Sequence, residues 1–319
     1  MDQIDLKGRL IVSKPSERLD QALARTFPDY SRSRLQQWLK AGYVSLNGDC
    51  VTDNRRKVTG GEEVIIKAQM QTEVSWFAQP MELNIIYEDE DILVVNKPAG
   101  LVVHPAAGNY DNTLVNGLLH YLPSLEAIPR AGVVHRLDKD TTGLMVVAKT
   151  LQSQTWLVNE LKCHNVERQY ECLIYGQLIA GGTIEQPIGR NPRNRLQMAV
   201  VANGKEAITH YRVNQKYADF SLVDVFLETG RTHQIRVHMN YIKHPIVGDP
   251  LYGSRLRIPK GCSEELKETM RRFNRQALHA KSLTLTHPRH KDTVQWQAER
   301  PTDFNQFLDL LNKEESQIV

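Results

Sequence analysis

The segment HRLDKDTTG, residues 135–143, places five ionisable side chains between two apolar runs. The flanking runs, AGVV and LMVVA, are rich in β-branched residues and predict two buried strands. Burial at a strand end raises the pKa of a carboxyl group, whereas a nearby guanidinium lowers it and keeps the group ionised. Asp138 stands two residues after Arg136, and an ionised carboxylate with little hydration is a good nucleophile. Taken alone, the pattern favours a structural salt bridge over a catalytic pair.

Two later segments offer partners for Asp138. The segment ETGRTHQIRVHM, residues 228–239, follows a strand and predicts a helix that opens at Arg231. An arginine at a helix start, near free N–H groups, can bind a phosphate or hold a carboxylate ionised. The segment ERQYECLIYG places Tyr170 in a strand beside Arg168. Its ring can stack on a base and its hydroxyl can move a proton, although a tyrosine of the core is the simpler interpretation of this segment alone.

A divalent metal site is the alternative chemistry for the same loop. His135, Asp138 and Asp140 offer three ligands, but Lys139 lies between the two acids and no second carboxylate cluster is near in sequence. Metal clamps need more oxygen ligands than this. The cysteines are far apart and form no CxxC pair, which argues against zinc and against a disulfide framework; they are Cys50, Cys163, Cys172 and Cys262. The sequence therefore predicts an active site without a metal.

Hairpin-linked strands with helices between them must position these residues. From residue 81 onward, the pattern predicts a hairpin turning at 88–91, a helix at 113–122, strand pairs at 208–228 and 281–298, and a last helix at 302–311. Regular alternation of strand and helix is missing. The fold class that follows is α+β with a mostly antiparallel sheet.

The first 70 residues read as a separate basic unit. They predict helices at 16–27 and 31–41, an Asn-Gly hairpin at 43–51 and a closing strand at 62–67. Residues 1–70 hold 12 Lys and Arg against nine Asp and Glu. The whole chain holds 40 against 37, so the remainder is neutral. This asymmetry suggests a polyanion-binding module, with Arg32, Arg34 and Lys40 on the second helix available to phosphate.

A chain of 319 residues fits two domains better than one. We expect an N-terminal extension at 1–16, the basic module at 17–67, a linker at 68–80 and a larger domain at 81–319. The N-terminus shows no secretory signal and no run is long enough to span a membrane, so a cytoplasmic protein is expected.

The basic module resembles the S4 RNA-binding domain. The matching features are RLDQALA, SRSRLQQWLKAGYVSLNG and GGEEVIIK, in that order over residues 17–67. In that family the second helix and the turn after it present basic side chains to structured RNA. The resemblance therefore implies that Arg32, Arg34 and Lys40 contact RNA, whereas a solvated helix face is the alternative.

The larger domain resembles the RluA family of pseudouridine synthases. Five motifs occur in the order typical of that family: NKPAGLVVHP, GVVHRLDKDTTGLMVVAKT, RQYECLIYG, ETGRTHQIRVHM and HPIVGDPLYG. With the S4 module, the likeness covers about residues 17–310 and extends to the members that modify large-subunit (23S) ribosomal RNA. It implies a mixed, mostly antiparallel synthase sheet and a cofactor-free isomerisation of uridine. It further implies a monomeric enzyme acting on helix 69 of that RNA or of the pre-50S particle.

The resemblance assigns roles to matching positions. Asp138 corresponds to the catalytic aspartate, and Arg136 to the arginine that helps open the RNA helix and replaces the flipped base. Tyr170 matches a tyrosine that stacks on uracil and assists proton removal. Arg231 matches the basic residue that pairs with the aspartate, and Ile235 would form an apolar wall near the base. Thr142 stands where many members carry serine.

Several points stay open at the level of sequence. Attack by the aspartate on C6 of the ring, attack on C1′ of the ribose, and a glycal route are all compatible with these residues. The sequence does not select the uridines or exclude transfer RNA as a substrate. An RNA-binding or ribosome-assembly factor without activity is the non-enzymatic alternative, although such a factor would not require Arg136, Asp138, Tyr170 and Arg231 together.

Overall fold

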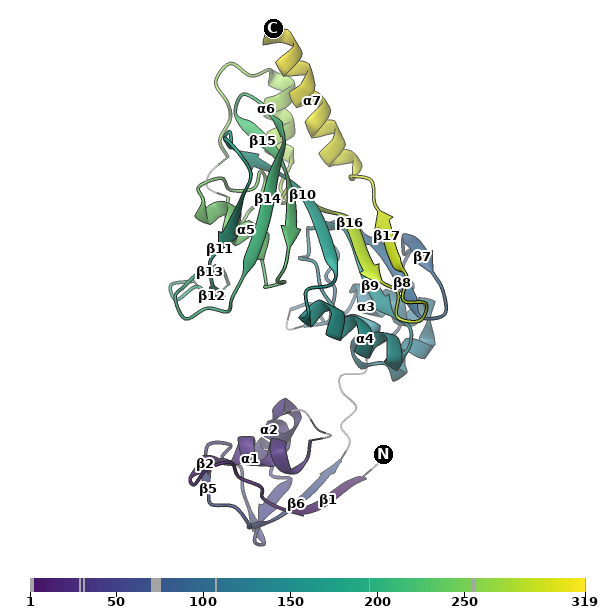
Figure 1. The fold of residues 1–319 in the computed structure, drawn as a ribbon, viewed down its shortest axis with the longest axis vertical. Helices are drawn as coiled ribbons and strands as arrows, with labels where there is room; N and C mark the ends of the chain where they lie inside the picture. The colour runs from purple at the N-terminus through teal and green to yellow at the C-terminus, as the bar shows by residue number, and fades with distance from the viewer. Residues whose placement is uncertain are drawn as a thin grey trace. The chain divides into compact units, whose positions relative to one another are not determined.

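The computed structural model describes residues 3–28, 30, 32–69, 76–106, 108–194, 196–253 and 256–318. The chain divides into two units, Met1–Ser75 and Trp76–Val319 (Figure 1). Among these residues, the helices are all too short or too polar to cross a membrane.

The first unit packs two helices against a four-stranded antiparallel sheet of order β1-β6-β3-β4. Its elements are β1 (Gln3–Arg9), β2 (Glu17–Arg18), α1 (Leu19–Thr26), α2 (Arg32–Lys40), β3 (Val44–Leu46), β4 (Asp49–Cys50), β5 (Lys57–Val58) and β6 (Glu63–Gln69). Leu19, Leu23, Leu35 and Leu39 are fully buried at the predicted helical spacing. Asn47 and Gly48 form the hairpin turn, and both have the positive φ that such a turn requires.

Two boundaries of this unit differ from the expectation. Strand β1 pairs with β6 along its whole length, so residues assigned to an N-terminal extension form an edge strand of the sheet. The strand is hard to predict because its sequence is largely polar, and an edge strand can leave much of its surface to solvent. At the other end, β6 extends to Gln69, and the backbone N–H of Gln79 donates to the carbonyl of Asn116 in the second unit. The expected linker at 68–80 therefore gives residues to both units.

The second unit is built on a nine-stranded sheet of order β11-β14-β15-β10-β16-β9-β8-β7, with β17 also paired to β16 (Figure 1). The strands of that sheet are β7 (Ile85–Glu88), β8 (Ile92–Lys97), β9 (Thr142–Ala148), β10 (Glu167–Tyr175), β11 (Gly182–Glu185), β14 (Ile208–Lys216), β15 (Phe220–Leu227), β16 (Leu278–Thr286) and β17 (Thr293–Gln297). Strands β12 (Ile188–Arg190) and β13 (Met198–Val200) form a separate two-stranded sheet. Only the β16–β9 pair is parallel among the described strands. The predicted α+β class with a mostly antiparallel sheet is confirmed.

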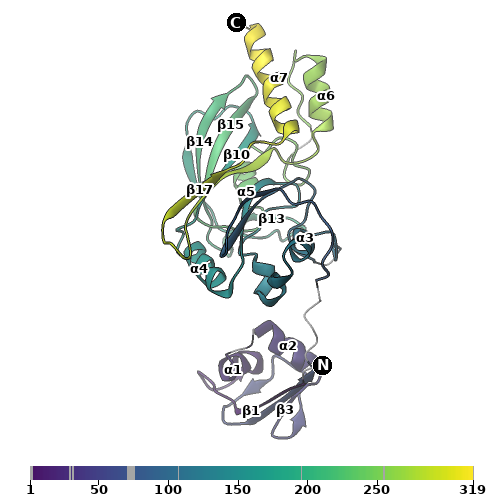
Figure 2. The same ribbon diagram turned by 90° about the vertical axis from the view of Figure 1, so that its right-hand side faces the viewer.

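Helices cover both faces of this sheet. They are α3 (Leu114–Tyr121), α4 (Leu151–Lys162), α5 (Gln234–Tyr241), α6 (Glu264–Arg272) and α7 (Thr302–Ile318), with short 3-10 helices at Pro123–Ala127 and Pro129–Gly132. In β8, Leu93 and Val95 join the large core that contains α3 and α7, whereas Ile92 and Val94 face the smaller core beneath α4. This alternation explains why β8 is apolar at almost every position. Helices α6 and α7 lie side by side in Figure 2.

The strand predicted for AGVV is wrong. Ala131 and Gly132 belong to the 3-10 helix Pro129–Gly132, and Val133 makes a single bridge to Val147. Gly132 has a φ of 76°, and a Cβ there would lie 1.9 Å from the carbonyl oxygen of Ala148. The run is buried because its backbone turns tightly against β9, which apolar composition alone does not distinguish from a strand.

Candidate active site

Asp138 lies in the loop that leads into β9, and backbone contacts fix that loop. The N–H of Thr141 donates to the carbonyl of Asp138 at 3.1 Å. The Nζ of Lys97 donates to the carbonyls of Lys139 (2.8 Å), Pro98 and Leu101. Lys97 is only 1% exposed, and burial lowers its pKa to about 7. A buried lysine therefore ties the residue after Asp138 to the end of β8.

The remainder of the loop is also held through backbone and hydroxyl groups. The side chain of Gln276 donates to Oγ1 of Thr141 at 3.0 Å. Gly143 has a φ of 113°, and a Cβ there would lie 2.2 Å from the carbonyl oxygen of Ala280. Lys139 and Asp140, to which the sequence assigns no role, contribute carbonyls: Lys139 to Lys97, and Asp140 to the guanidinium of Arg275 at 3.5 Å.

The arginine that pairs with Asp138 is Arg236, and the prediction that Arg231 does so is wrong. The Nη1 of Arg236 donates to Oδ2 of Asp138 at 3.0 Å. Its Nε and Nη2 donate to both oxygens of buried Asp249, at 2.7 and 2.9 Å. These two carboxylates outweigh the effect of burial and raise the pKa of Arg236, so it remains charged. Arg231 instead donates from Nε to the carbonyl of Glu206 at 2.8 Å.

A left-handed residue explains the error. His233 has a φ of 56° and stands just before α5, so the helix begins at Gln234 rather than at Arg231. The Oε1 of Gln234 accepts from the N–H of Arg231, which fixes the turn before the helix. Arg236 carries a usable sequence signal, because an arginine between Ile235 and Val237 on a buried helix must find an ionic partner.

Tyr170 lies in β10 as predicted and is 5% exposed. Burial raises the pKa of its hydroxyl; Arg168 acts in the opposite direction and Asp138 adds to the rise. Ile235 is 4% exposed in the first turn of α5. Arg136 is exposed, and its guanidinium makes neither a hydrogen bond nor an ion pair within the described part of the chain.

One cavity of about 510 Å³ brings these side chains together. Its walls are the loop at 133–138, the start of β10, the segment 227–236 and the last turns of α4. Asp138, Tyr170, Arg136, Arg231 and Ile235, all predicted from the sequence, line it. Its volume falls in the range of about 300–1,000 Å³ that is typical of small-molecule sites.

His233 lines the cavity beside Asp138, and Tyr252 contacts His233. The hydroxyl of Tyr252 contacts Nδ1 of His233 at 2.7 Å and accepts from the N–H of Met198. The Nε2 of His233 lies 3.9 Å from Oδ1 of Asp138. Burial lowers the pKa of His233, which favours its neutral form. The ring of Tyr252 lies under the guanidinium of Arg236, with the guanidinium carbon 5.0 Å from the ring centre. The motif HPIVGDPLYG therefore supplies two residues that hold Arg236 in place, namely Asp249 and Tyr252.

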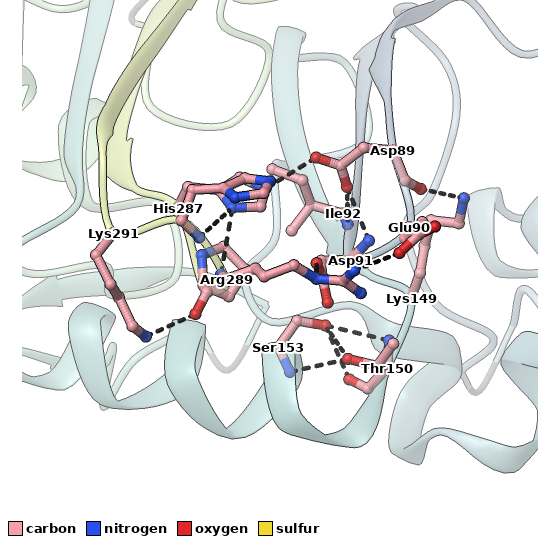
Figure 3. A network of polar contacts seen from close by, with 12 residues as sticks. Asp89, Glu90, Asp91, Ile92, Lys149, Thr150, Ser153, His287, Arg289 and Lys291 are labelled. Carbon is pink, nitrogen blue, oxygen red and sulfur yellow. Dashed lines mark hydrogen bonds and ion pairs between the residues drawn. The ribbon is translucent and has the colours of Figure 1, made fainter.

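The metal-binding alternative for this loop is not favoured by the geometry. The Nε2 of His135 accepts from the N–H of Val146 at 3.1 Å, which commits that nitrogen to β9. Within the described residues, the group of three potential ligands that comes together is a different one, Asp89, Asp91 and His287. There, Nδ1 of His287 accepts from the N–H groups of Arg289 and His290, and Nε2 faces Asp89 (Figure 3).

Helix α2 of the first unit carries the predicted RNA-binding cations. Arg32 donates from Nη2 to the fully buried Asp20 at 2.7 Å and is about half exposed. Lys40 is exposed in the last turn. The side chain of Arg34, and the N-cap expected at residue 31, lie outside the described residues. Arg32 therefore has a structural partner that the sequence pattern does not reveal.

Comparison with known proteins gives a consistent set of relatives. Residues 91–241 match the family model described as RNA pseudouridylate synthase, and residues 17–64 match the S4 domain. The chain is 50% identical to ribosomal large subunit pseudouridine synthase D of Vibrio parahaemolyticus, over 98% of this chain and 96% of the relative. The protein of that name from Escherichia coli K12 is 49% identical, over 97% and 95%. The solved structure of human RNA pseudouridylate synthase domain containing 1 is 28% identical, with a TM-score of 0.54 over 73% of this chain and 87% of that one.

Proposed function

Because the chain belongs to the RNA pseudouridylate synthase family, we propose that it converts specific uridines of large-subunit (23S) ribosomal RNA, in the helix 69 stem-loop, to pseudouridine. The observation that carries the proposal is the Asp138 carboxylate, held by Arg236 at the wall of a cavity that also contains Tyr170. The names of the relatives at 49–50% identity support the choice of RNA.

The reaction breaks the bond between N1 and C1′, turns the uracil and joins it again through C5. Asp138 starts it, by attack on C6 or C1′ or by taking the C2′ proton. Its Oδ2 is paired with Arg236, whereas Oδ1 accepts no hydrogen bond within the described residues and is the oxygen we assign to the reaction. Tyr170 stacks on the base, and its hydroxyl takes up the C5 proton, directly or through water, as it passes its own proton toward N1. The isomerisation gains and loses no atoms, so these steps need no cofactor.

The target base must leave its helix to reach the cavity, at a cost of a few kcal/mol. Arg136 occupies the gap that the base leaves, and Arg231 contacts phosphate; both line the cavity, and Arg136 is exposed there, which supports these roles. Arg32, Arg34 and Lys40 of the S4 unit bind a neighbouring part of the RNA. The enzyme acts as a monomer on 23S RNA or a pre-50S particle in the cytoplasm.

Pseudouridine mapping of ribosomal RNA from a deletion strain tests the proposal. Carbodiimide-based mapping should show specific uridines that are unmodified in the deletion strain and restored by the wild-type gene. Asp138→Asn should not restore them, because the amide cannot act as a carboxylate nucleophile or base. Full modification by Asp138→Asn would exclude the catalytic role, and an unchanged map on deletion would exclude the assigned RNA.

A further inference from the structure

Arg168 is a buried cation without a carboxylate partner in the described chain. Its side chain lies in β10, two residues before Tyr170 and on the same face, and the residue is only 8% exposed. Nη2 donates to the carbonyls of Glu228 (3.1 Å) and Leu227 (3.4 Å). Nε is buried and has no hydrogen-bond partner. Both Arg168 and Tyr170 line the cavity that contains Asp138.

The other buried arginines of this unit pair with carboxylates. Arg236 binds Asp249 and Asp138, and Arg275 binds Asp303 with Nη2 to Oδ1 at 2.7 Å. Burying a charge is costly unless an opposite charge or strong hydrogen bonds compensate it. Arg168 has only two carbonyl contacts from one nitrogen, so the missing anion must come from what enters the cavity.

The guanidinium is fixed before any ligand arrives. A Cβ on Gly230 would lie 2.8 Å from Nη1 of Arg168, so the backbone of this segment passes close to the guanidinium. The carbonyls of Leu227 and Glu228 hold the other end nitrogen. A charge that is fixed in advance stabilises a developing opposite charge without the cost of reorganisation.

We propose that Arg168 is a catalytic residue that stabilises the uracil anion formed when the N1–C1′ bond breaks. This inference rests on the proposed function. By attack of Asp138 on C1′, and by the glycal route in which Asp138 takes the C2′ proton, the electron pair of the broken bond leaves with N1. The negative charge is shared among N1, O2 and O4 of the uracil. When C5 then bonds to C1′, the ester bond between C1′ and Asp138 breaks or, by the glycal route, Asp138 returns its proton to C2′. The C5 proton is lost and N1 gains a proton, which leaves a neutral pseudouridine.

Single-turnover kinetics with saturating full-length enzyme and a large-subunit RNA stem-loop test this role. Arg168→Gln should lower the rate of N1–C1′ cleavage by about 100-fold or more, the loss typical for removing one anion-stabilising donor. Arg168→Lys, which keeps a charge without the planar fork, should lose less, about tenfold. The Kd for the RNA should change less than about threefold. Arg272→Gln, an exposed arginine of α6 that pairs with Glu268, is the matched control and should stay within about twofold of wild type.

A substrate with a better leaving group separates this role from others. Fluorine at C5 stabilises the uracil anion. The loss of cleavage rate caused by Arg168→Gln should therefore be at least about tenfold smaller with a 5-fluorouridine target than with uridine. A phosphodiester is the other anion that this nucleotide could supply. If Arg168→Gln weakens RNA binding instead of cleavage, and a methylphosphonate beside the target removes that difference, Arg168 binds phosphate and the proposal is wrong.

The remaining outcomes are also decisive. A rate for Arg168→Gln near that of wild type, or an equal deficit with uridine and 5-fluorouridine, would overturn the proposal. Urea unfolding identifies a variant that fails to fold, in which case the Arg168→Lys variant with both substrates carries the comparison. A wild-type enzyme that modifies no large-subunit RNA would instead contradict the proposed function, which keeps the two failures apart.

Discussion

At the scale of single residues, Arg236 binds two carboxylates and makes a different number of hydrogen bonds to each. Arg236 gives two hydrogen bonds to Asp249 and one to Asp138. The N–H groups of Leu251 and Tyr252 also donate to Asp249, so this buried acid is fully engaged. Asp138 is held through one oxygen only, which leaves the other oxygen free to react. Asp249 is thus a positioning residue for the pair.

Arg236→Gln should both destabilise the fold and slow the reaction. The substitution leaves buried Asp249 without its cation, which costs about 3–5 kcal/mol of unfolding free energy. The rate of pseudouridine formation should also fall, because Asp138 loses its only ionic partner among the described arginines. Urea unfolding and single-turnover assays measure the two effects. Arg231→Gln, which removes a contact to one carbonyl, should cost less than about 1 kcal/mol; equal stability of both variants would contradict this assignment.

Part of the site follows from the sequence because it depends on strand ends and motif order. Asp138 and Tyr170 are predicted on that basis, and both line the cavity. Arg236 escapes prediction because the left-handed His233 delays the start of α5 and shifts the phase of the helix. A single φ angle of this kind leaves no clear mark in the pattern of apolar residues.

At the scale of elements, two turns of the sheet are tied together by a polar network (Figure 3). Asp89, in the β7–β8 turn, accepts from the N–H groups of Asp91 and Ile92 and contacts His287, after β16, at 2.8 Å. Arg289 pairs with Asp91 across the same gap. The cluster therefore acts as an ionic link between β8 and β16, which are both neighbours of β9 in the sheet.

This link should weaken in acid. Burial alone would raise the pKa of Asp89, but the N–H groups of Ile92 and Asp91 and two side-chain donors outweigh it and lower the pKa to about 2, against 3.8 in a free chain. Its contribution is therefore complete above about pH 4 and is lost as the pH falls toward 2, by about 2 kcal/mol. Urea unfolding of wild type and Asp89→Asn should differ by that amount at pH 5 and converge near pH 2. The same substitution at exposed Asp111, Asp111→Asn, is the control. A difference in unfolding free energy between wild type and Asp89→Asn that stays constant across this pH range would refute the link.

Lys97 links the end of β8 to the loop that contains Asp138. Its replacement should therefore lower both the stability of the fold and the rate of the reaction. Lys97→Met leaves the carbonyls of Pro98, Leu101 and Lys139 without their donor. Each buried acceptor left without a donor costs about 1–3 kcal/mol. Because local rearrangement recovers part of this, the free energy of unfolding should fall by about 2–4 kcal/mol in total. Pseudouridine formation should also slow, since Lys139 follows Asp138 directly. Urea unfolding with exposed Lys260→Met as the control measures the difference, and equal stability would contradict it.

The elements themselves were predictable where periodicity decides them. The hairpin at β7–β8, helix α3 and the pair β14–β15 lie where the pattern predicts them. Edge strand β1 and the tight turn at 129–132 were not, because their structure depends on pairing and positive φ angles rather than on periodicity. Helix α7 extends to Ile318 although its apolar stripe ends at Leu311, since hydrogen bonds such as Ser263 N–H to Glu314 hold its second half.

At the scale of the whole molecule, charge and chemistry are assigned to different units. Most of the small excess of basic residues belongs to the first unit, with 12 Lys and Arg against 10 Asp and Glu, whereas the cavity belongs entirely to the second. Point substitution is a poor way to separate them, because Arg32→Glu would place a second carboxylate against buried Asp20 and destabilise the S4 unit. Removing a whole unit avoids that difficulty, since each has its own hydrophobic core.

A chain of residues 76–319 should keep the chemistry and lose affinity. Its cores involve no residue before 76, so we expect cooperative unfolding near that of the full chain. At saturating enzyme its single-turnover rate should stay within about threefold of the full chain, because Asp138, Tyr170 and Arg236 are all retained. Its Kd for the RNA should rise, and the slope of log Kd against log salt should become shallower as fewer phosphate contacts release counterions. An unchanged Kd and slope would show that the S4 unit does not bind this RNA.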